Sequence, residues 1–511
     1  MKQQSFIRTC EDQNLLSFWR GQASLGADNT ALKQYILQQE DKLLPRFSEH
    51  YKKLKALPRQ VRRYLQRRWK QSLAGLALLL ALGQTPVLAA TINVGGACTL
   101  ARAIRSANND ASRFCTPGSG ADEIVLHANS THRLTAANNR DYGRTGLPVI
   151  RSVITVDGNG STIRRASAAP KFRILAVGHT GNLTLRQTTV SGGVAAGSVT
   201  GSRGGGLLNY GTLILTNSTI SGNLAREGGG VSSRTSFTHG NLASVTLTNS
   251  TISGNTAIGD LSIGGGVYNG FYANLSVTNS TISRNTAGDE GGGVDNGYSA
   301  SLSMANSTIS GNAAGGEGGG VNNDAHGDVT LIRTLVSGNT AMRGAEIINN
   351  RSTITAGNFN LFGHRGVNSA NAFLGFTPGP TDITATSDGY RPTALAAILD
   401  TSLANNGGPT QTHALVAGSP AIDAVTDGTC PPPDTDQRGV SRPQDSNGDG
   451  GSACDIGSYE FVFTGTAPVQ APPQPVAPTP PPAPESVIPA PTPSEPVAPN
   501  PGRRIRPSPN P

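Results

Sequence analysis

The chain has 511 residues, of which only 5% are aromatic and 64 are glycine, a composition that suits a thin, repetitive core rather than a large globular one. Its net charge of +8 arises in the first 89 residues, which hold 15 Lys and Arg against 6 Asp and Glu, while the remainder holds 26 against 27. Because the remainder is close to neutral, the basic balance does not indicate a nucleic-acid-binding protein.

A secretory leader with a long n-region is predicted at residues 1–89. The positively charged segment RRYLQRRWKQ (62–71) precedes an apolar run at 72–82, and Val87-Leu88-Ala89 offers a small-residue cleavage site. The uninterrupted apolar run is short for a bilayer span. We therefore expect an exported chain that begins near Ala90 and has no transmembrane segment, with an uncleaved signal anchor as the alternative.

The start of the mature chain predicts an N-terminal cap within residues 90–121, where four apolar residues recur at helical spacing: Leu100, Ala103, Ile104 and Ala107. Asp122–Thr135 and Val149–Arg164 are interpreted as irregular first turns of a β-solenoid. The terminal repeats of a solenoid must be atypical, because their exposed ends need capping.

A repeated segment organises the middle of the chain. Its strongest copies are LILTNSTISGN (213–223), VTLTNSTISGN (245–255), LSVTNSTISRN (275–285) and LSMANSTISGN (302–312), with weaker copies at 183–193 and 329–339. The shared serine recurs at spacings of 30, 32, 30, 27 and 27 residues, and each strong copy is followed by a polar loop and GGGV. A period in this range indicates a solenoid with one repeat per turn.

The apolar residues change phase within each repeat. Leu213 and Leu215 alternate with polar residues, as in a half-buried strand, but the next apolar residue, Ile220, is out of phase. The change requires a corner, so one turn is divided into a strand at Leu213–Leu215, a corner at Asn217–Ser218, a strand at Thr219–Ser221, a corner at Gly222–Asn223 and a strand at Gly228–Val231. Three short strands per turn predict a parallel β-helix whose turns stack about 4.8 Å apart.

Two columns of asparagine are expected to stack at the corners and to satisfy backbone groups through their amides. The first contains Asn217, Asn249, Asn279 and Asn306; the second contains Asn223, Asn255, Asn285, Asn312 and Asn339. The alternation of apolar and polar residues along the repeat places Leu247 in the core and Ser250 at a solvent-facing corner.

Acidic residues recur before the triple glycines: Glu227, Glu290 and Glu317, with Asp260 and Asp289 close by. Glu290 and Glu317 lie one turn apart, which would allow their carboxylates to approach the separation of about 5–5.5 Å that retaining glycosidases use. Because the acids recur with the repeat, and because we expect no histidine, arginine or aspartate cluster beside them, we favour copied turn residues. A catalytic pair is the alternative.

Aromatic residues also recur before each new turn: Tyr210, Tyr272, Tyr298 and, in the same place, His326. An exposed aromatic column would suit a glycan-binding face. The alternative is that these rings only shield the edge of a loop.

Beyond residue 350 the repeat decays, and residues 384–463 are predicted to form a small module. Within it, the segment Asp445-Ser-Asn447-Gly-Asp449-Gly matches the first half of a calcium loop. The twelfth position is Ile456, so the last carboxylate would come from Asp455. Two interpretations stay open: a Ca²⁺ site made by Asp445, Asn447, Asp449 and Asp455, or a solvated loop closed by Cys454.

The mature chain has four cysteines: Cys98, Cys115, Cys430 and Cys454. An even number in an exported chain predicts two disulfides, with three connectivities. Since a solenoid separates its two ends, we favour the local pairs Cys98–Cys115 and Cys430–Cys454. Four free thiols are the alternative.

Three segments resemble known families. CTLARAIRSANND…CTPGSGADEIVL (98–126) resembles the CSLREA-type domain of secreted bacterial β-helix proteins, although Ala101-Arg102 replaces Arg-Glu. ISGN followed by GGGV resembles polymorphic outer-membrane protein repeats. NNGGPTQTHALVAGSPAIDA (405–424), with DQRGVSRP (436–443) and CDIGSYEF (454–461), closely resembles the choice-of-anchor Q module. The resemblance implies a bacterial secreted or surface β-helix, generally without assigned catalytic residues.

Together these observations predict an all-β protein, a single-stranded right-handed parallel β-helix of pectin lyase-like fold, the hand following from chirality and the resemblance. Its expected parts are a leader (1–89), a cap (90–121), the β-helix (122–383, regular at 182–350), the C-terminal module (384–463) and a disordered Pro-rich tail (464–511).

We expect an exported, adhesin-like scaffold that is either secreted to the extracellular space or located at the cell surface or outer membrane. It would bind glycans or other surface molecules without catalysis or a required cofactor, and in the surface-bound form it would be attached to the cell envelope. The alternative is a polysaccharide-active lyase or hydrolase on the same fold. A polar cluster that breaks the repeat on one face would favour the enzyme, whereas uniform columns would favour the scaffold.

Overall fold

The structure is a computed structural model that describes residues 89–197, 201–236, 242–426, 428, 430 and 433–463. The predicted leader (apart from Ala89) and the predicted Pro-rich tail lie outside the described residues. The described residues all belong to one compact unit. Every helix within these ranges is too short or too polar to span a bilayer.

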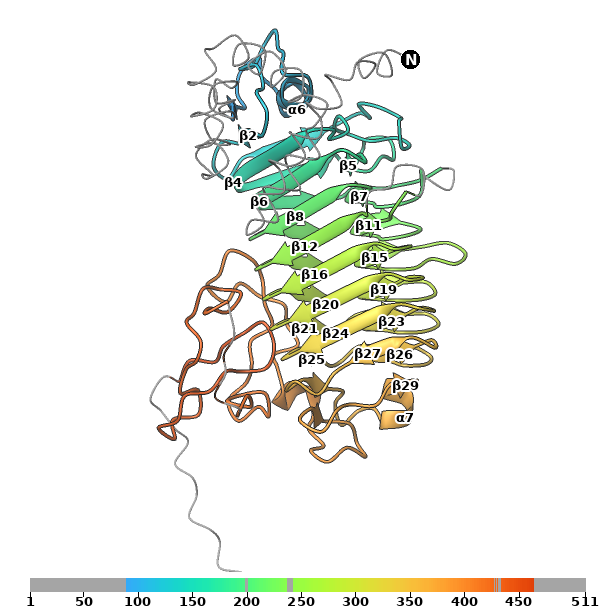
Figure 1. The fold of residues 1–511 in the computed structure, drawn as a ribbon, viewed down its shortest axis with the longest axis vertical. Helices are drawn as coiled ribbons and strands as arrows, with labels where there is room; N and C mark the ends of the chain where they lie inside the picture. The colour runs from blue at the N-terminus through green and yellow to red at the C-terminus, as the bar shows by residue number, and fades with distance from the viewer. Residues whose placement is uncertain are drawn as a thin grey trace, which may run out of the picture. The chain divides into compact units, whose positions relative to one another are not determined.

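The described strands wind into a right-handed parallel β-helix of about 10 turns (Figure 1). One face stacks a first series of strands: β4 (Val153–Arg165), β6 (Asn182–Ser191), β8 (Thr212–Thr216), β12 (Ser244–Thr248), β16 (Asn274–Thr278), β20 (Ser301–Ala305), β24 (Asp328–Ile332) and β27 (Thr353–Thr355). After the first corner come β9 (Thr219–Ser221), β13 (Thr251–Ser253), β17 (Thr281–Ser283), β21 (Thr308–Ser310), β25 (Leu335–Val336), β28 (Leu361–Phe362) and β30 (Ile383–Thr384).

Two further sheets complete each turn. A narrow sheet contains β10 (Leu224–Ala225), β14 (Thr256–Ala257), β18 (Thr286–Ala287) and β22 (Ala313–Ala314). The last sheet contains β5 (Leu175–Val177), β7 (Leu207–Asn209), β11 (Val231–Ser233), β15 (Val267–Asn269), β19 (Val294–Asn296), β23 (Val321–Asn323), β26 (Ile347–Asn349) and β29 (Phe373–Leu374). The predicted third strand therefore starts at Val231 rather than Gly228, because the glycines form the tight corner that precedes it, and the short strand β10 was not expected.

The register between turns explains the core. Leu213 pairs with Val245, and Val245 pairs with Leu275, so equivalent aliphatic side chains stack directly on one another. The four residues predicted to point inward in one turn are all fully buried: Leu213, Leu215, Ile220 and Val231. These four inward positions are therefore confirmed, and each turn shares its core with the turns above and below.

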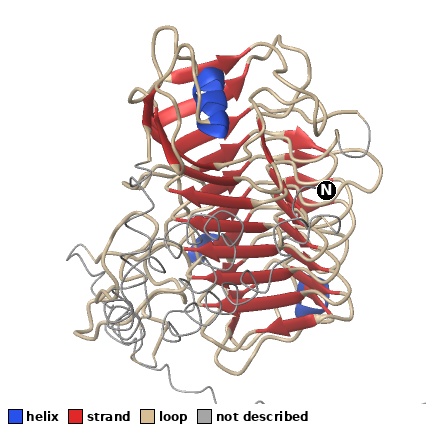
Figure 2. Cartoon of the chain, turned by 45° about the horizontal axis from the view of Figure 1, so that its top comes forward, coloured by secondary structure: helices blue, strands red, loops and turns tan. Residues whose placement is uncertain are grey.

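The N-terminal end is closed by β1 (Thr91–Asn93), α6 (Leu100–Asn109), β2 (Asp122–Val125) and β3 (Thr131–Leu134). The helix α6 buries the predicted face of Leu100, Ala103, Ile104 and Ala107 against the first strands (Figure 2). Cys98 and Cys115 form a disulfide beside it, as the sequence favoured.

The second predicted asparagine column is an amide ladder. Asn255 donates its backbone N–H and its side-chain amide to the Oδ1 atom of Asn285, at 3.0 and 2.9 Å. The same two bonds join Asn285 to Asn312 and Asn312 to Asn339. The buried carboxylate of Glu346 ends the ladder by accepting from the amide of Asn339 at 2.7 Å.

The first predicted asparagine column plays a different role. Asn217, Asn249, Asn279 and Asn306 all have φ between 45° and 50°, a left-handed conformation that asparagine tolerates and that makes the corner. The Oδ1 atoms of the first three have no hydrogen-bond partner among the described residues, so no amide ladder forms here.

Serines make the hydrogen-bond column at this corner instead. The Ser250 hydroxyl accepts from the backbone N–H of Ser218 at 3.2 Å, and Ser250 is fully buried. The expectation of a solvent-facing Ser250 is therefore wrong. The left-handed asparagine turns the following residue inward, which the sequence pattern alone did not reveal.

A further amide ladder, which the sequence analysis missed, runs through the ends of the third-sheet strands. The amide of Asn269 donates to Asn296 and that of Asn296 donates to Asn323, each at 2.8 Å. The ladder continues from Asn323 to Asn349 at 2.9 Å.

Residues after β30 pack along the side of the β-helix, beside β16 to β25 in Figure 1. This C-terminal segment, which includes η1 (Leu395–Ala397), shares a hydrophobic cluster with Leu335 and Leu361 of the solenoid. It covers the outward threonines of the repeat: Thr281 donates to Gln437 and Thr251 to the carbonyl of Gln411, both at 2.7 Å. The short helix α7 (Ser369–Ala372) precedes β29.

Candidate functional site

The candidate site lies on the outer side of the third sheet, where β15, β19 and β23 stack in Figure 1. In these strands the first side chain enters the core and the third forms the amide ladder, so the middle side chain faces away from the core. From β7 to β26 the middle residues are Leu208, Ser232, Tyr268, Asp295, Asn322 and Ile348. All six are buried, and their chemistry changes at every turn.

Three acidic residues meet at this position. Glu290 lies before β19, Asp295 is the middle residue of β19, and Asp324 directly follows β23. One carboxylate oxygen from each lies within 4.8 Å of the other two, and no other such group of acidic, histidine or cysteine side chains occurs in the described part of the chain. We call these three residues the acidic cluster.

Asn322 orients two members of the acidic cluster. Its side-chain amide donates to Glu290 Oε2 at 3.2 Å and to Asp295 Oδ2 at 2.9 Å. Asp295 is fully buried, and its other oxygen, Oδ1, has no hydrogen-bond partner among the described residues. An unsatisfied buried carboxylate oxygen is unfavourable, so the cluster favours an additional positive partner.

The electrostatics lead to the same conclusion. Burial and the negative charge of Asp324 raise the pKa of Asp295 well above its ordinary value. Burial, Asp324 and Asp289 raise the pKa of Glu290, and burial raises the pKa of Asp324. The Asn322 amide opposes all three shifts without cancelling them. The cluster therefore binds protons more readily than isolated carboxylates do, because its carboxylates are buried or half-buried and lie close to other negative charges.

The predicted glutamate column is present, but its members have different partners. Parallel bridges join Glu227 to Ile263, Ile263 to Glu290 and Glu290 to Glu317. Glu227 is buried and accepts from Arg203 and Arg226 at 2.7 Å and from Arg234 at 3.1 Å. Glu317 forms an ion pair with Arg343, whereas Glu290 belongs to the acidic cluster.

One expectation about this column is therefore wrong. Arginines and an aspartate cluster do accompany the glutamates, because loops of different lengths bring them over the sheet from other parts of the turn. Glu290 and Glu317 are neighbours, as predicted, but they have separate partners, with Glu290 bound to Asn322 and Glu317 to Arg343. This arrangement does not support the two of them as a catalytic pair.

Aromatic side chains lie at one edge of the same sheet. Tyr272 and Tyr298 are 40% and 41% exposed, and their ring centroids are 6.2 Å apart. His326 is exposed and lies 5.2 Å from Tyr298. We call these three residues the aromatic edge. Phe271 packs 6.1 Å from Tyr298, and the Arg234 guanidinium lies over Phe271 at 4.9 Å.

Tyr210 does not belong to the aromatic edge, contrary to the prediction. It is buried and packs against Tyr142 and His179, with ring centroids 5.1 Å apart in both pairs. Tyr210 directly follows the ladder position of its strand, whereas Tyr272 lies three residues after Asn269. Because the two tyrosines lie at different distances along the chain from the ladder position, the Tyr210 ring is buried whereas the Tyr272 ring is exposed.

The predicted calcium loop does not assemble its four ligands. The Asp445 carboxylate accepts from the backbone N–H groups of Gly448, Asp449 and Gly450. Asp455 is instead fully buried and accepts from the backbone N–H groups of Asp423 and Phe461. Asp455 therefore does not join Asp445, Asn447 and Asp449, because it belongs to the interior of the C-terminal segment.

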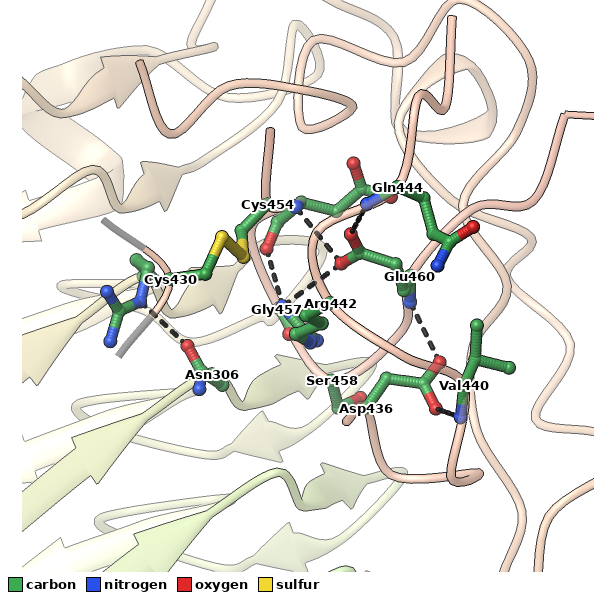
Figure 3. A network of polar contacts seen from close by, with 12 residues as sticks. Asn306, Cys430, Asp436, Val440, Arg442, Gln444, Cys454, Gly457, Ser458 and Glu460 are labelled. Carbon is green, nitrogen blue, oxygen red and sulfur yellow. Dashed lines mark hydrogen bonds and ion pairs between the residues drawn. A yellow bond between two sulfur atoms is a disulfide. The ribbon is translucent and has the colours of Figure 1, made fainter. Parts of the chain in front are cut away.

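Asp455 is part of a buried polar network, in which Arg442, Gly457 and Glu460 are labelled in Figure 3. Arg442 donates to the carbonyls of Asp455 and Gly457 at 2.8 and 2.7 Å and pairs with Glu460 at 3.3 Å. The disulfide between Cys430 and Cys454, which the sequence also favoured, lies beside this network. The network joins segment 436–443 to segment 454–461, both of which carry the resemblance to the choice-of-anchor Q module. These two segments therefore have a structural role.

This network should make stability depend on pH. Burial and the charge of Glu460 raise the pKa of Asp455 to about 8, and burial raises the pKa of Glu460 to about 7. The folded pair therefore keeps protons that the unfolded chain has already lost. Unfolding free energy should fall as pH rises from about 5 to about 8, at about 1.4 kcal/mol per pH unit for each proton retained, and then level off.

Thermal unfolding of the exported chain across this pH range, compared with Glu460→Gln, measures the effect. The variant should show a flatter pH dependence than the wild type, because it removes one of the two coupled acids. Parallel pH profiles for the two proteins would contradict the assignment.

No family model matches the sequence, and no curated protein matches it. Among solved structures, the chain is similar to one described as the crystal structure of pectate lyase Pel9A, with 17% sequence identity and a TM-score of 0.40 over 67% of this chain and 88% of that one. A likeness of this extent says nothing about activity. The resemblances to the CSLREA-type domain, the outer-membrane repeats and the anchor module remain predictions.

Sequence reasoning missed Asp295, Asn322 and Asp324. The signal was available in the segments VYN (267–269), VDN (294–296) and VNN (321–323), where the valine and asparagine repeat but the middle residue does not. In a solenoid, a position that varies between otherwise copied residues is a candidate for function.

Proposed function

We propose that this chain is an exported bacterial surface scaffold whose β-helix binds glycans at the aromatic edge without cleaving them. The observation that carries the proposal is the exposure of Tyr272, Tyr298 and His326 on consecutive turns, next to a polar sheet. Exposed rings bind the apolar faces of sugars, and neighbouring carboxylates and amides accept or donate hydrogen bonds to hydroxyl groups. The resemblances at residues 98–126 and 405–461 support export and surface attachment.

Tyr298 should dominate binding, because it contacts both other members of the aromatic edge. We expect Tyr298→Ala to weaken glycan affinity by about tenfold, the loss of about 1.4 kcal/mol of stacking, with little change in Tm. A glycan array identifies the ligand, and titration calorimetry measures its Kd.

The matched control is Tyr390→Ala, since Tyr390 is also exposed but lies outside the aromatic edge. It should bind as the wild type does. Equal losses for the two variants, or a wild type that binds no glycan, would reject the aromatic edge as a binding site.

A second function has one specific observation in its favour. The acidic cluster breaks the repeat on one face, the feature that distinguishes a polysaccharide-active enzyme from a uniform scaffold. Product analysis of the bound glycans decides between the two functions. Cleavage by the wild type that Glu290→Gln lacks would replace the scaffold with an enzyme.

A further inference from the structure

Glu290 differs from the other two glutamates of its column, because the acidic cluster to which it belongs has no positively charged partner among the described residues. Buried Glu227 has three arginines, and Glu317 has Arg343. In the described part of the chain, no lysine, arginine or histidine forms an ion pair with Glu290, Asp295 or Asp324. Arginine side chains therefore neutralise Glu227 and Glu317, whereas the negative charge at Glu290 is left for a partner from outside the chain.

The second observation concerns the inner end of the cluster. Asp295 is fully buried, and its Oδ1 has no partner among the described residues, although Oδ2 is bonded to Asn322. Glu290 and Asp324 are only half-buried, so the outer end of the cluster is open to solvent. We propose that Glu290, Asp295 and Asp324 bind one divalent cation, with Ca²⁺ as the occupant.

The ligand chemistry selects a hard cation. All three side chains supply carboxylate oxygens, which suit calcium, magnesium and manganese rather than zinc or copper. The three oxygens lie within 4.8 Å of one another. Ca²⁺ takes about 6–8 oxygen ligands in a flexible arrangement, whereas Mg²⁺ demands a near-ideal octahedron and gives up its waters reluctantly. Three carboxylates with one side open to solvent therefore suit Ca²⁺, and water would complete its coordination at the open side.

Asn322 is a positioning residue in this site. Its amide donates to both Glu290 and Asp295 and so fixes the orientation of the two carboxylates relative to each other. This cation site does not depend on the proposed glycan binding, because it is assembled by the chain alone and is tested without glycan.

Titration calorimetry of the exported chain with CaCl₂ after treatment with a chelator provides the test, with thermal unfolding as a second readout. The wild type should bind one Ca²⁺ at this site and gain Tm, and MgCl₂ should give a smaller effect. Asp295→Asn should weaken Ca²⁺ affinity by more than about tenfold, since loss of even an outer-shell partner costs that much.

Two matched variants make the result specific. Glu317→Gln changes the neighbouring acid of the same column, and Asp445→Asn changes the loop that resembles a calcium site; both should retain the calcium response. In chelator, Asp295→Asn should melt no lower than the wild type, because it removes repulsion within the cluster. Asp324→Asn, at a half-buried position, provides the same test if Asp295→Asn does not fold.

A wild type whose Tm and calorimetric signal do not respond to Ca²⁺ would overturn the proposal. A response that survives Asp295→Asn and Asp324→Asn but disappears in Asp445→Asn would also overturn it and would assign calcium to the loop instead.

Discussion

Replacing Leu247 with aspartate should unfold the β-helix or lower its stability by more than about 4 kcal/mol, the range reserved for a buried unpaired charge. Leu247 is fully buried within β12 and pairs in register with Leu215 and Val277. Aspartate at this position would have no cation within the core. Because each turn is stabilised by its neighbours, the damage should extend into the adjacent turns.

The matched control for this change is Thr246→Asp, on the same strand. Thr246 is half-buried and faces outward, so its charge would remain hydrated. We expect the control to lose less than about 1 kcal/mol. Urea unfolding followed by circular dichroism measures both variants. Similar losses for the two would contradict the assignment of inward and outward faces along β12.

Breaking the amide ladder should have the next largest effect. Asn255 is fully buried; its Oδ1 accepts from the backbone N–H and the side-chain amide of Asn223, both at 3.0 Å. Its own amide donates to the carbonyl of Ile220 at 2.9 Å. Asn255→Ala would leave several buried polar groups unpaired. Each such group costs about 1–3 kcal/mol, so we expect a total loss of about 3–5 kcal/mol.

Asn249 in the same turn provides the control, because it makes a corner rather than a ladder. Its φ is 49° and its Oδ1 has no partner among the described residues. Asn249→Gly should therefore change stability by less than about 1 kcal/mol, since glycine adopts the left-handed conformation without strain. Thermal unfolding of the two variants separates the roles of the two columns; a larger loss for Asn249→Gly would reverse them.

The candidate site illustrates how a repetitive fold acquires a local function. Close packing limits variation at the core positions, so these positions are nearly identical in successive turns. The middle residues of the third sheet face away from the core and are free to differ: Tyr268, Asp295 and Asn322 occupy equivalent positions on consecutive turns. One turn therefore provides an aromatic ring, the next a carboxylate and the next an amide, within the spacing of neighbouring strands.

The sequence by itself determined the β-helix, its period, its inward residues and the ladder of Asn223 and its equivalents. These features depend on local alternation and on copied residues that stack in register, so a single repeat contains the information. The two disulfides also followed from the sequence, because separate ends of a solenoid favour local pairing.

Only the tertiary structure decided which outward positions are buried and which charges are neutralised. The same threonine of the repeat is half-buried at Thr219 but fully buried at Thr281, since the C-terminal segment returns to cover only the later turns. Likewise, Glu227 meets three arginines while Glu290 meets two aspartates. Loops of unequal length determine these encounters, and the repeat pattern contains no information about where such loops place their side chains.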